Sequence, residues 1–322
     1  MKITLLHGSD ALEPPPDPVL DQVAGALVAS GHLVHRLAVG NAIEPIIGAL
    51  REEAPDLVFN LTESFDGKSA LDSSIASLLN LIGLRYTGSS PAGLMLAGDK
   101  SLTKKVLGFH GIRTPEFATL YRGALDHAGD LKFPLIVKPP QEDASMGITE
   151  SSVVSDLREL LQRMDDLQTT YQQPVLIEQF IPGREFYVAI LGNANAAALP
   201  VVELDFSRDA ANRYRIASYE VKWAEDEAIS AAESIIAENL PPELDAEMKR
   251  IALEAFQALR LRDYARIDMR VSEAGEVFVI EVNPNCYLEQ ESEFAMAASA
   301  GGIAFGDLVN RIAELATARY SR

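Results

Sequence analysis

Residues 266–285 read RIDMRVSEAGEVFVIEVNPN, the most informative segment of the 322-residue chain. Its first and last parts are rich in apolar and β-branched residues, which favour extended strands. Between them, residues 272–276 read SEAGE, a turn-forming run that includes Gly275. The segment therefore predicts a β-hairpin, in which two antiparallel strands are joined by a tight turn.

The register of this predicted hairpin brings polar side chains together. A turn centred between residues 274 and 275 places Asp268 opposite Glu281 and Arg266 opposite Asn283. Side chains alternate between the two faces of a strand, so these four share one face. Opposed Cβ atoms lie about 4.5–5.5 Å apart, and two carboxylates that close repel each other unless a cation lies between them.

Asp268, Glu281 and Asn283 therefore form a candidate magnesium site. Oxygen ligands suit the hard Mg²⁺ ion, which usually keeps several waters and completes its shell with substrate phosphates. The alternative is a polar hairpin face in solvent, on which the charges offset one another. Apolar residues on the opposite face favour a sheet covered on both sides, and hence the metal site: Ile267, Met269, Ile280 and Val282.

The composition argues against several classes of protein. The formal net charge of −19 argues against a nucleic-acid or anionic-membrane surface, because phosphate groups are bound by excess Lys and Arg. The single cysteine, Cys286, excludes an internal disulfide and a cysteine-based zinc site. The N-terminal apolar run is too short for a signal peptide, and no segment approaches the roughly 18 apolar residues of a membrane span. We therefore expect a cytoplasmic protein.

Residues 1–95 alternate between strand-like and helix-like patterns. Such alternation with short connections predicts an open parallel sheet covered by helices. Ligands bind these sheets at the carboxyl ends of strands, which are residues 7–9 and 60–63 here. The predicted strands are 3–6, 32–38, 57–59 and 85–87, and the predicted helices are 19–30, 43–53 and 71–81.

The pattern changes near residue 96, where a lysine-rich helix begins a region of mixed strands and helices. We expect an α/β fold with three parts, residues 1–95, 96–182 and 183–322. Beyond the hairpin, the predicted strands are 135–138, 175–178 and 185–191, and the predicted helices are 99–108, 153–166, 225–240, 243–261 and a last one from about 305.

The hairpin, residues 264–268 with 281–284, resembles the magnesium motif of the ATP-grasp ligases, and the chain as a whole resembles the D-alanine–D-alanine ligases among them. The resemblance implies an ATP-grasp architecture, in which a Rossmann-like open-sheet N-terminal domain and two α+β lobes enclose ATP. It also implies two Mg²⁺ ions, with Mn²⁺ as a substitute, amino-acid-like substrates and a homodimer. The other matching segments are 86–89 with 99–104, 133–148, 177–181 and 183–185.

Most residues matched by this resemblance would bind the nucleotide. Lysines would contact its phosphates, a loop would cover them, Glu178 and the backbone of residues 180–181 would receive adenine, and Glu185 would receive the ribose. Without the resemblance, Lys100 and Lys138 could equally be solvated surface lysines, and residues 180–181 would be core. The implied set is Lys100, Lys138, Ser145, Met146, Gly147, Glu178, Gln179, Phe180, Ile181, Glu185, Lys222 and Ile280.

A further set of residues would handle the reacting groups. Arg266 is placed to neutralise the oxyanion that forms when an amine attacks an acyl-phosphate, assisted by the Ser145 backbone. Its alternative role is a structural ion pair with Asp268 or Glu281. Glu13 is a candidate amine-binding carboxylate, or else a solvated loop residue. The implied substrate-binding residues are Glu13, Trp223, Arg266, Asn283 and Ser292.

Two positions depart from the pattern of these ligases. Ala144 stands where these ligases usually have a serine, and Trp223 stands where they usually have a tyrosine. The resemblance implies a network of hydrogen bonds made by the serine and tyrosine hydroxyl groups, and neither alanine nor tryptophan has a hydroxyl group with which to reproduce it. Three glutamates within residues 289–293 also surround Ser292, which aligns with the serine that binds the acceptor carboxylate. These changes lie in the substrate pockets, which indicates retained chemistry with altered substrate choice.

The sequence leaves three hypotheses open. The first is an ADP-forming ligase that joins a carboxylate to an amine but uses substrates other than two D-alanines. The second is a genuine D-alanine–D-alanine ligase that tolerates Ala144 and Trp223. The third is an ATP-binding protein without ligase activity, which the retained Asp268, Glu281 and Arg266 disfavour.

Overall fold

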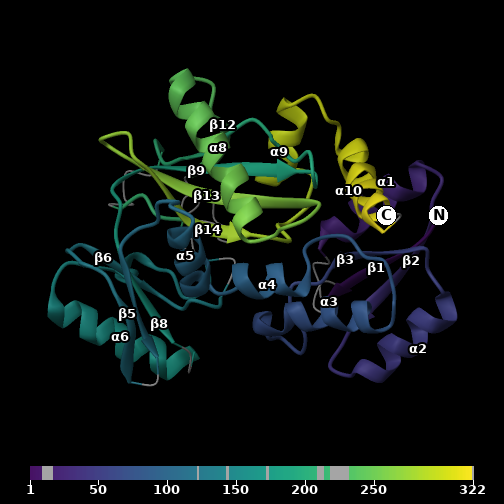
Figure 1. Ribbon diagram of the computed structural model, residues 1–322, viewed down its shortest axis with the longest axis horizontal. Helices are drawn as coiled ribbons and strands as arrows, with labels where there is room; N and C mark the ends of the chain where they lie inside the picture. Colours follow the sequence, from purple (N-terminus) through teal and green to yellow (C-terminus); the bar gives the residue numbers. More distant parts are fainter. Residues whose placement is uncertain are drawn as a thin grey trace.

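A computed structural model of the protein describes residues 1–8, 17–121, 123–142, 145–171, 174–208, 214–217 and 232–320. The predictions for Glu13, Ala144, Lys222 and Trp223 fall outside these ranges. The described chain forms three sheets, which lie in turn within residues 1–95, 96–182 and 183–322, although the limits of the domains themselves stay predictions. In Figure 1 the first sheet lies at the right, the second at the lower left and the third above them.

The first sheet is parallel and open, with the strand order β2-β1-β3. This confirms the prediction made from the alternating pattern. The predicted strand at 85–87 is reduced to one bridge, between Val58 and Tyr86. The elements are β1 (Lys2–Gly8), α1 (Pro18–Ala29), β2 (Leu33–Val39), α2 (Ile43–Glu53), β3 (Leu57–Leu61) and α3 (Asp72–Leu81).

The second sheet is antiparallel, in the order β5-β4-β8-β6-β7, and α6 packs against it. The predicted helix at 153–166 begins only at Leu157, because Val153 and Val154 pair with β6. The elements are β4 (Phe117–Tyr121), β5 (Ala124–Ala128), β6 (Leu135–Lys138), β7 (Val153–Val154), α6 (Leu157–Tyr171) and β8 (Val175–Gln179), preceded by α4 (Pro91–Ala97) and α5 (Lys100–Phe109).

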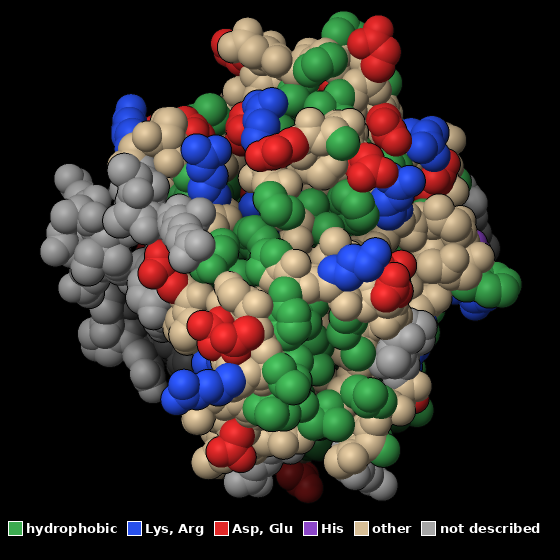
Figure 2. Space-filling view, turned by 90° about the vertical axis from the view of Figure 1, so that its left-hand side faces the viewer, with side chains coloured by type: hydrophobic (Ala, Val, Ile, Leu, Met, Phe, Trp, Pro, Cys, Tyr) green, Lys and Arg blue, Asp and Glu red, His purple; other side chains and the backbone are tan. Residues whose placement is uncertain are grey.

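Figure 2 shows the face of the molecule on the side of this second sheet. Hydrophobic side chains gather in a band down the middle, and acidic and basic side chains are interspersed around it. The acidic charge of the chain is therefore not concentrated on this face. Among the described residues, no helix is both long enough and apolar enough to cross a bilayer.

The third sheet carries the hairpin in the order β12-β11-β9-β13-β14, with β10 paired to β9. The helix predicted at 225–240 is wrong where the structure describes it, because residues 233–236 form an edge strand paired with β11. The β-branched Ile235 and Ile236 favour that pairing. The elements are β9 (Gly183–Leu191), β10 (Ala197–Ala198), β11 (Val202–Asp205), β12 (Glu233–Ile236), α8 (Pro242–Ala258), β13 (Tyr264–Ser272), β14 (Val277–Asn283), α9 (Glu293–Ala300) and α10 (Phe305–Arg319).

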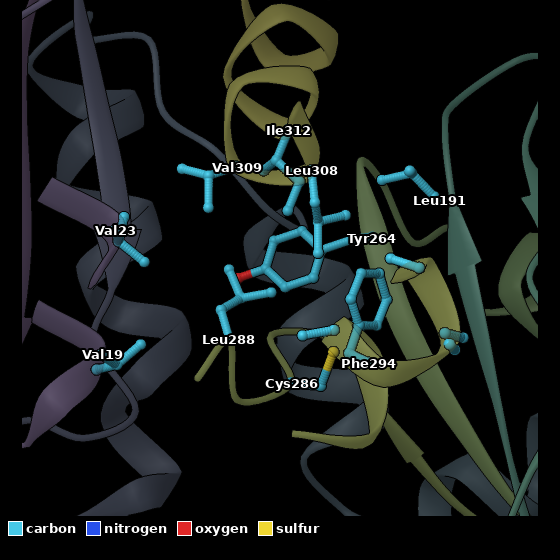
Figure 3. Close-up of a cluster of buried hydrophobic side chains, with 14 of the residues drawn as sticks. Val19, Val23, Leu191, Tyr264, Cys286, Leu288, Phe294, Leu308, Val309 and Ile312 are labelled. Atoms are coloured by element: carbon cyan, nitrogen blue, oxygen red, sulfur yellow. The ribbon is translucent and has the colours of Figure 1, made fainter. Parts of the chain in front are cut away.

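A hydrophobic cluster joins the beginning of the chain to its end. Val19 and Val23 of α1 face α10, with Tyr264 and Leu288 between them (Figure 3). The Tyr264 ring meets the Phe294 ring edge-on at 5.7 Å. Burying such side chains contributes about 1.5–3 kcal/mol each, so the N-terminal and C-terminal parts are held as one unit.

Candidate active site

The hairpin pairs as predicted at its polar end. Arg266 lies opposite Asn283 and Asp268 lies opposite Glu281. Near the turn the register differs by one residue from the prediction, since Val271 pairs with Val277. A β-bulge between Asp268 and Met269 absorbs the difference.

The bulge also corrects the expected position of Ile280. This residue was predicted on the core face, but it lines a pocket together with Glu281, and Val279 takes the place in the core opposite Met269. A bulge places two residues of one strand against one of its partner, which breaks the strict alternation of faces. Ile280 thereby lies on the pocket side of the sheet, where the resemblance to the ligases implied a nucleotide-binding residue.

Each of the two facing carboxylates has a cationic partner. The Arg266 guanidinium donates two hydrogen bonds to Asp268, at 2.8 and 2.9 Å, and a third to Glu293 at 2.9 Å. Lys100 Nζ lies 2.7 Å from Glu281. Burial alone would lower the pKa of Arg266, but Asp268 and Glu293 raise it well above its usual value. The predicted structural ion pair of Arg266 with Asp268 is therefore present.

The donor chemistry of this face fits a magnesium ion. Asp268 and Glu281 supply two carboxylates that face each other, and Asn283 adds an amide oxygen. The amide nitrogen of Asn283 is buried without a hydrogen-bond partner among the described atoms. No group of three or more His, Cys, Asp or Glu in the described ranges is arranged to hold a metal. Mg²⁺ is commonly held by one or two carboxylates plus substrate phosphates, so this sparse set is sufficient.

A narrow pocket separates the second sheet from the third, and it contains most of the predicted nucleotide-binding residues. Its volume is about 70 Å³, and Asp268 and Glu281 form part of its wall. Lys100 does not line it but reaches it through the ion pair with Glu281. The predicted residues in the wall are Lys138, Ser145, Glu178, Gln179, Phe180, Ile181, Glu185 and Ile280.

Two buried lysines hold Glu178 in this pocket. Lys138 Nζ lies 2.9 Å from one carboxylate oxygen and Lys104 Nζ lies 3.2 Å from the other. Burial raises the pKa of Glu178, but the two lysines together lower it below its ordinary value. Burial also lowers the pKa of Lys104 to about 8, against the opposing effect of Glu178. Lys138 is therefore buried rather than the solvated surface lysine of the alternative interpretation.

Glu185 is paired with Arg270 on the neighbouring strand, at 2.9 Å. Arg270 also donates to the backbone carbonyls of Ile181 and Gly183, at 2.9 and 3.1 Å. One guanidinium thus fixes the connection between β8 and β9, where the adenine-binding backbone was predicted. Phe180 and Ile181 are buried in the same connection, so they are core residues and pocket residues at once.

The loop at 145–147, which the resemblance placed over the phosphates, forms a turn. Ser145 and Gly147 have positive φ angles of 61° and 73°, and Ser145 Oγ donates to the carbonyl of Ala217 at 2.8 Å. A Cβ atom at Gly147 would lie 3.0 Å from Tyr171 Oη. Met146 is 43% exposed and is not part of the pocket wall.

A larger cavity of about 630 Å³ adjoins the hairpin at the ends of β13 and β14. Arg266, Asn283 and Ser292 all line it, so the structure brings these predicted substrate residues together. Ser292 caps α9, because its side chain accepts from the backbone N–H of Ala295. A cap of this kind leaves the N-terminal end of the helix facing the cavity, where it favours negative charge.

A second cavity of about 260 Å³ lies where strand ends were expected to bind ligands. His7 and Gly8 at the end of β1 line it, together with Asn60 near the end of β3 and Thr62 just after it. Burial raises the pKa of Cys286, another lining residue, above its ordinary value, which disfavours the reactive thiolate form.

Three residues were not singled out from the sequence as site residues: Arg270 and Asp17, which line these pockets, and Lys104, which pairs with Glu178. Arg270 continues the period-two series of Arg266 and Asp268, which is a signal that could have found it. Lys104 lies one helical turn after Lys100, on the same face of α5. Nothing local distinguishes Asp17, which enters the site through long-range packing, whereas Asn60 lies in the strand end 60–63 that was expected to bind ligands.

The comparisons with known proteins agree with this geometry. Residues 106–314 match the family model described as D-Ala-D-Ala ligase C-terminus. A D-alanine–D-alanine ligase of Desulforudis audaxviator is 32% identical over 92% of each chain. The chain therefore belongs to the D-alanine–D-alanine ligase family. It is a C–N bond-forming ligase with the ATP-grasp fold.

Two further proteins are similar to this ligase. The uncharacterized protein y4sG of Sinorhizobium fredii is 34% identical over 82% of this chain and 75% of its own length. The D-alanine–D-alanine ligase of Bacillus anthracis, solved in complex with ATP, superposes with a TM-score of 0.76 over 100% of this chain and 99% of that one. Its sequence is 24% identical, so this likeness shows the fold alone.

Proposed function

We propose that this ligase uses ATP to join the carboxylate of one amino-acid-like substrate to the amine of another, releasing ADP and phosphate. The observation that carries the proposal is the hairpin face, on which Asp268 opposes Glu281 beside Arg266. That face borders the narrow lysine-bearing pocket on one side and the 630 Å³ cavity on the other. Nucleotide and substrates would therefore meet at the hairpin.

In the first step, an oxygen of the donor carboxylate attacks the γ-phosphorus and ADP leaves. Lys100, which pairs with Glu281, and Lys138, which pairs with Glu178, would spread the charge that develops on the phosphate oxygens. Asp268, Glu281 and Asn283 would hold Mg²⁺, which when bound supplies further charge neutralisation on those oxygens. The product of the step is an acyl-phosphate.

In the second step, the acceptor amine attacks the acyl carbon, and phosphate leaves with the oxygen that came from the carboxylate. The attack places negative charge on the former carbonyl oxygen. Arg266 is held by Asp268 and Glu293, so its guanidinium is oriented before the reaction and costs little reorganisation. The backbone of Ser145 would add donors from the covering loop.

Binding of a nucleotide requires the narrow pocket to open. Small-molecule pockets usually have volumes of about 300–1,000 Å³, and this one measures about 70 Å³. The pocket lies between β8 of the second sheet and β14 of the third, so separation of the two sheets would widen it. We infer that ATP binds to a more open arrangement, and that the described structure corresponds to a closed one.

We propose that the substrates are not two D-alanines. Ala144 and Trp223 cannot form the hydroxyl network expected at those positions, and the cavity beside Ser292 is acidic. The competing candidate is a genuine D-alanine–D-alanine ligase, the name that several relatives carry.

Release of ADP and phosphate decides between these candidates. The purified protein would be given Mg-ATP with D-alanine alone, and then with pairs of L- and D-amino acids, with the product identified by mass. We expect little release with D-alanine and clear release with another pair. A D-alanyl-D-alanine product at a substantial rate would contradict the altered substrate choice, and bound ATP without release for any pair would indicate a non-catalytic binder.

The assembly state and the cellular location stay predictions. A homodimer would have twice the chain mass of 35.0 kDa, which light scattering measures directly. A monomer at working concentration would contradict the expectation drawn from relatives. The location requires imaging or fractionation of cells.

A further inference from the structure

We propose that one of the two substrates is a basic amino acid, whose additional positive charge is held in the joined acidic cavities beside the hairpin. This inference rests on the proposed function, because it specifies the substrate class of the same site. It goes beyond that function by assigning a charge, and a place for that charge, to a substrate side chain.

The two cavities share a wall and offer more room than alanine needs. The 630 Å³ and 260 Å³ spaces are both lined by Asp17, Glu63, Asn285 and Tyr287. The larger one begins at Arg266, where the reacting groups would meet. A long substrate side chain would extend along the larger cavity toward the shared wall, whereas a single methyl group would leave the smaller space unused.

The charges around this space are strongly unequal. Seven carboxylates and one guanidinium are found among the described residues that line the larger cavity. The guanidinium, Arg266, is already directed at Asp268 and Glu293. Clefts lined by charges of one sign concentrate their field and attract ligands of the opposite sign. The described lining therefore favours a cation.

Two of the carboxylates that line the cavities, Asp17 and Glu289, accept hydrogen bonds from neutral donors, which do not offset their charge. Asp17 accepts from the backbone of Val19 and from the Tyr287 hydroxyl, at 3.0 and 2.7 Å. Glu289 accepts from the amide of Gln22 at 2.7 Å. A carboxylate offers about four acceptor sites, so each can still receive an ammonium or guanidinium.

A second observation, independent of the acidic residues, indicates a ligand in the smaller cavity. Asn60 lines it and is fully buried, and its Oδ1 accepts from Thr62 Oγ1 at 2.6 Å. The Nδ2 atoms of Asn60 and Asn285 have no hydrogen-bond partner among the described atoms. Buried donors without partners are costly and are uncommon in native proteins. Oxygen atoms of a bound amino acid would satisfy them, while its ammonium groups face the carboxylates.

Calorimetric titration of the full chain with MgADP present tests the assignment without requiring turnover. The probes are lysine, ornithine and arginine in both enantiomers, against norleucine, which matches the length of lysine but lacks the second ammonium. We expect at least one basic amino acid to bind about tenfold or more tightly than norleucine, as one charge-assisted contact provides. Alanine should bind more weakly still.

Two matched variants locate the effect. Glu63→Gln removes an exposed carboxylate from the shared wall, and Glu52→Gln removes an exposed one from α2, away from both cavities. We expect Glu63→Gln to reduce the preference for the basic amino acid several-fold, and Glu52→Gln to leave it unchanged. Equal or tighter binding of norleucine, binding of none of the basic amino acids, or an unchanged preference in Glu63→Gln would overturn the assignment.

The outcome also separates this inference from the proposed function. Selective binding of a basic amino acid without release of ADP for any pair would contradict the ligase activity and leave the charge assignment standing. Release of ADP with neutral pairs, and no preference for a basic amino acid in either assay, would support the ligase and contradict the assignment.

Discussion

The narrow pocket and the two substrate cavities meet at one hairpin but differ in the groups that contact their carboxylates. In the narrow pocket, buried carboxylates are matched by buried cations, as Glu178 is by Lys104 and Lys138, and Glu185 by Arg270. In the cavities, Asp17 and Glu289 are held by hydroxyl, amide and backbone donors instead.

This difference separates shared chemistry from specificity. A pocket whose carboxylates are already paired with cations does not depend on its ligand to balance their charge, which suits a nucleotide common to the whole family. A cavity with an excess of one charge is completed by its ligand, so its composition selects that ligand. The predictions below test this contrast, beginning with the hairpin that both sites share.

Loss of either facing carboxylate should have the largest effect. Asp268→Asn or Glu281→Gln should lower the rate of ADP release by about 10³-fold or more, because each removes a charge that organises Mg²⁺ and the phosphates. The fold should persist, as judged by circular dichroism and thermal unfolding. Glu276→Gln is the control, since this glutamate lies near the turn of the same hairpin and forms an exposed pair with Arg113. A substantial rate in either carboxylate variant would refute the role given to the hairpin.

Removal of Arg270 should destabilise the protein at the narrow pocket, where the buried carboxylates are paired with cations. Arg270→Met leaves Glu185 buried without its cation and leaves the carbonyls of Ile181 and Gly183 without a donor. We expect a loss of about 3–5 kcal/mol in the free energy of unfolding, measured with urea. Arg250→Met, which breaks an exposed helix pair with Glu254, should cost about 0.5 kcal/mol or less. Similar losses for the two variants would contradict the claim that the narrow pocket depends on buried pairing.

The pH dependence of stability should reveal the burial of Lys104. Its pKa is about 8 in the folded protein and near 10.5 in the unfolded chain, so above pH 8 the unfolded state binds more protons. Stability contributed by this site therefore rises with pH between about 8 and 10, by at most about 1.4 kcal/mol per pH unit.

The comparison variant is Lys104→Met, which lacks this site. The free energy of unfolding of the wild type relative to the variant should increase over that pH interval. Lys105→Met, at the neighbouring and more exposed position, is the matched control. If the difference in the free energy of unfolding between wild type and Lys104→Met stayed constant or decreased over this pH interval, burial would not lower the pKa of Lys104.

Gly147→Ala should have a smaller effect, confined to the covering loop. The backbone there has a φ angle of 73°, and the new Cβ atom would press against Tyr171. We expect a loss of about 1 kcal/mol in the free energy of unfolding and weaker binding of ATP. Gly48→Ala is the control, because it lies in α2 with no atom within 4 Å of its Cβ position. It should be neutral or stabilising, since alanine favours helix. Equal behaviour of the two variants would mean that the loop does not need glycine.

The hairpin wall of the narrow pocket could be predicted from local patterns, and the rest of its wall from the resemblance to the D-alanine–D-alanine ligases. The pairing of Asp268 with Glu281 follows from strand alternation and one turn, and it survived a one-residue error near the turn because the bulge compensates. Lys138 and Glu178 lie at or near the ends of two apolar strands that are easily recognised. The same kind of argument failed at residues 233–236, where an acidic, alanine-rich neighbourhood suggested helix but two isoleucines pair with β11.

The substrate cavities could not be assembled in this way. Asp17 and Tyr287 are in contact although they are 270 residues apart in the sequence. The cluster of Figure 3, in which Val19 and Val23 of α1 pack near Leu288, brings these two parts of the chain together. Asn60 enters because β3 ends there, and its unpaired amide shows only in three dimensions. Such contacts depend on tertiary packing, and no local spacing encodes them.

The fate of the carboxylate oxygen tests the central claim most directly. A donor amino acid labelled with ¹⁸O in its carboxylate would be turned over with Mg-ATP and its acceptor, and the released phosphate would be analysed by mass spectrometry. An acyl-phosphate intermediate transfers one labelled oxygen to each phosphate, and this is the result we predict. Release of unlabelled phosphate would show that water rather than the carboxylate attacks ATP, and would contradict ligation at the hairpin.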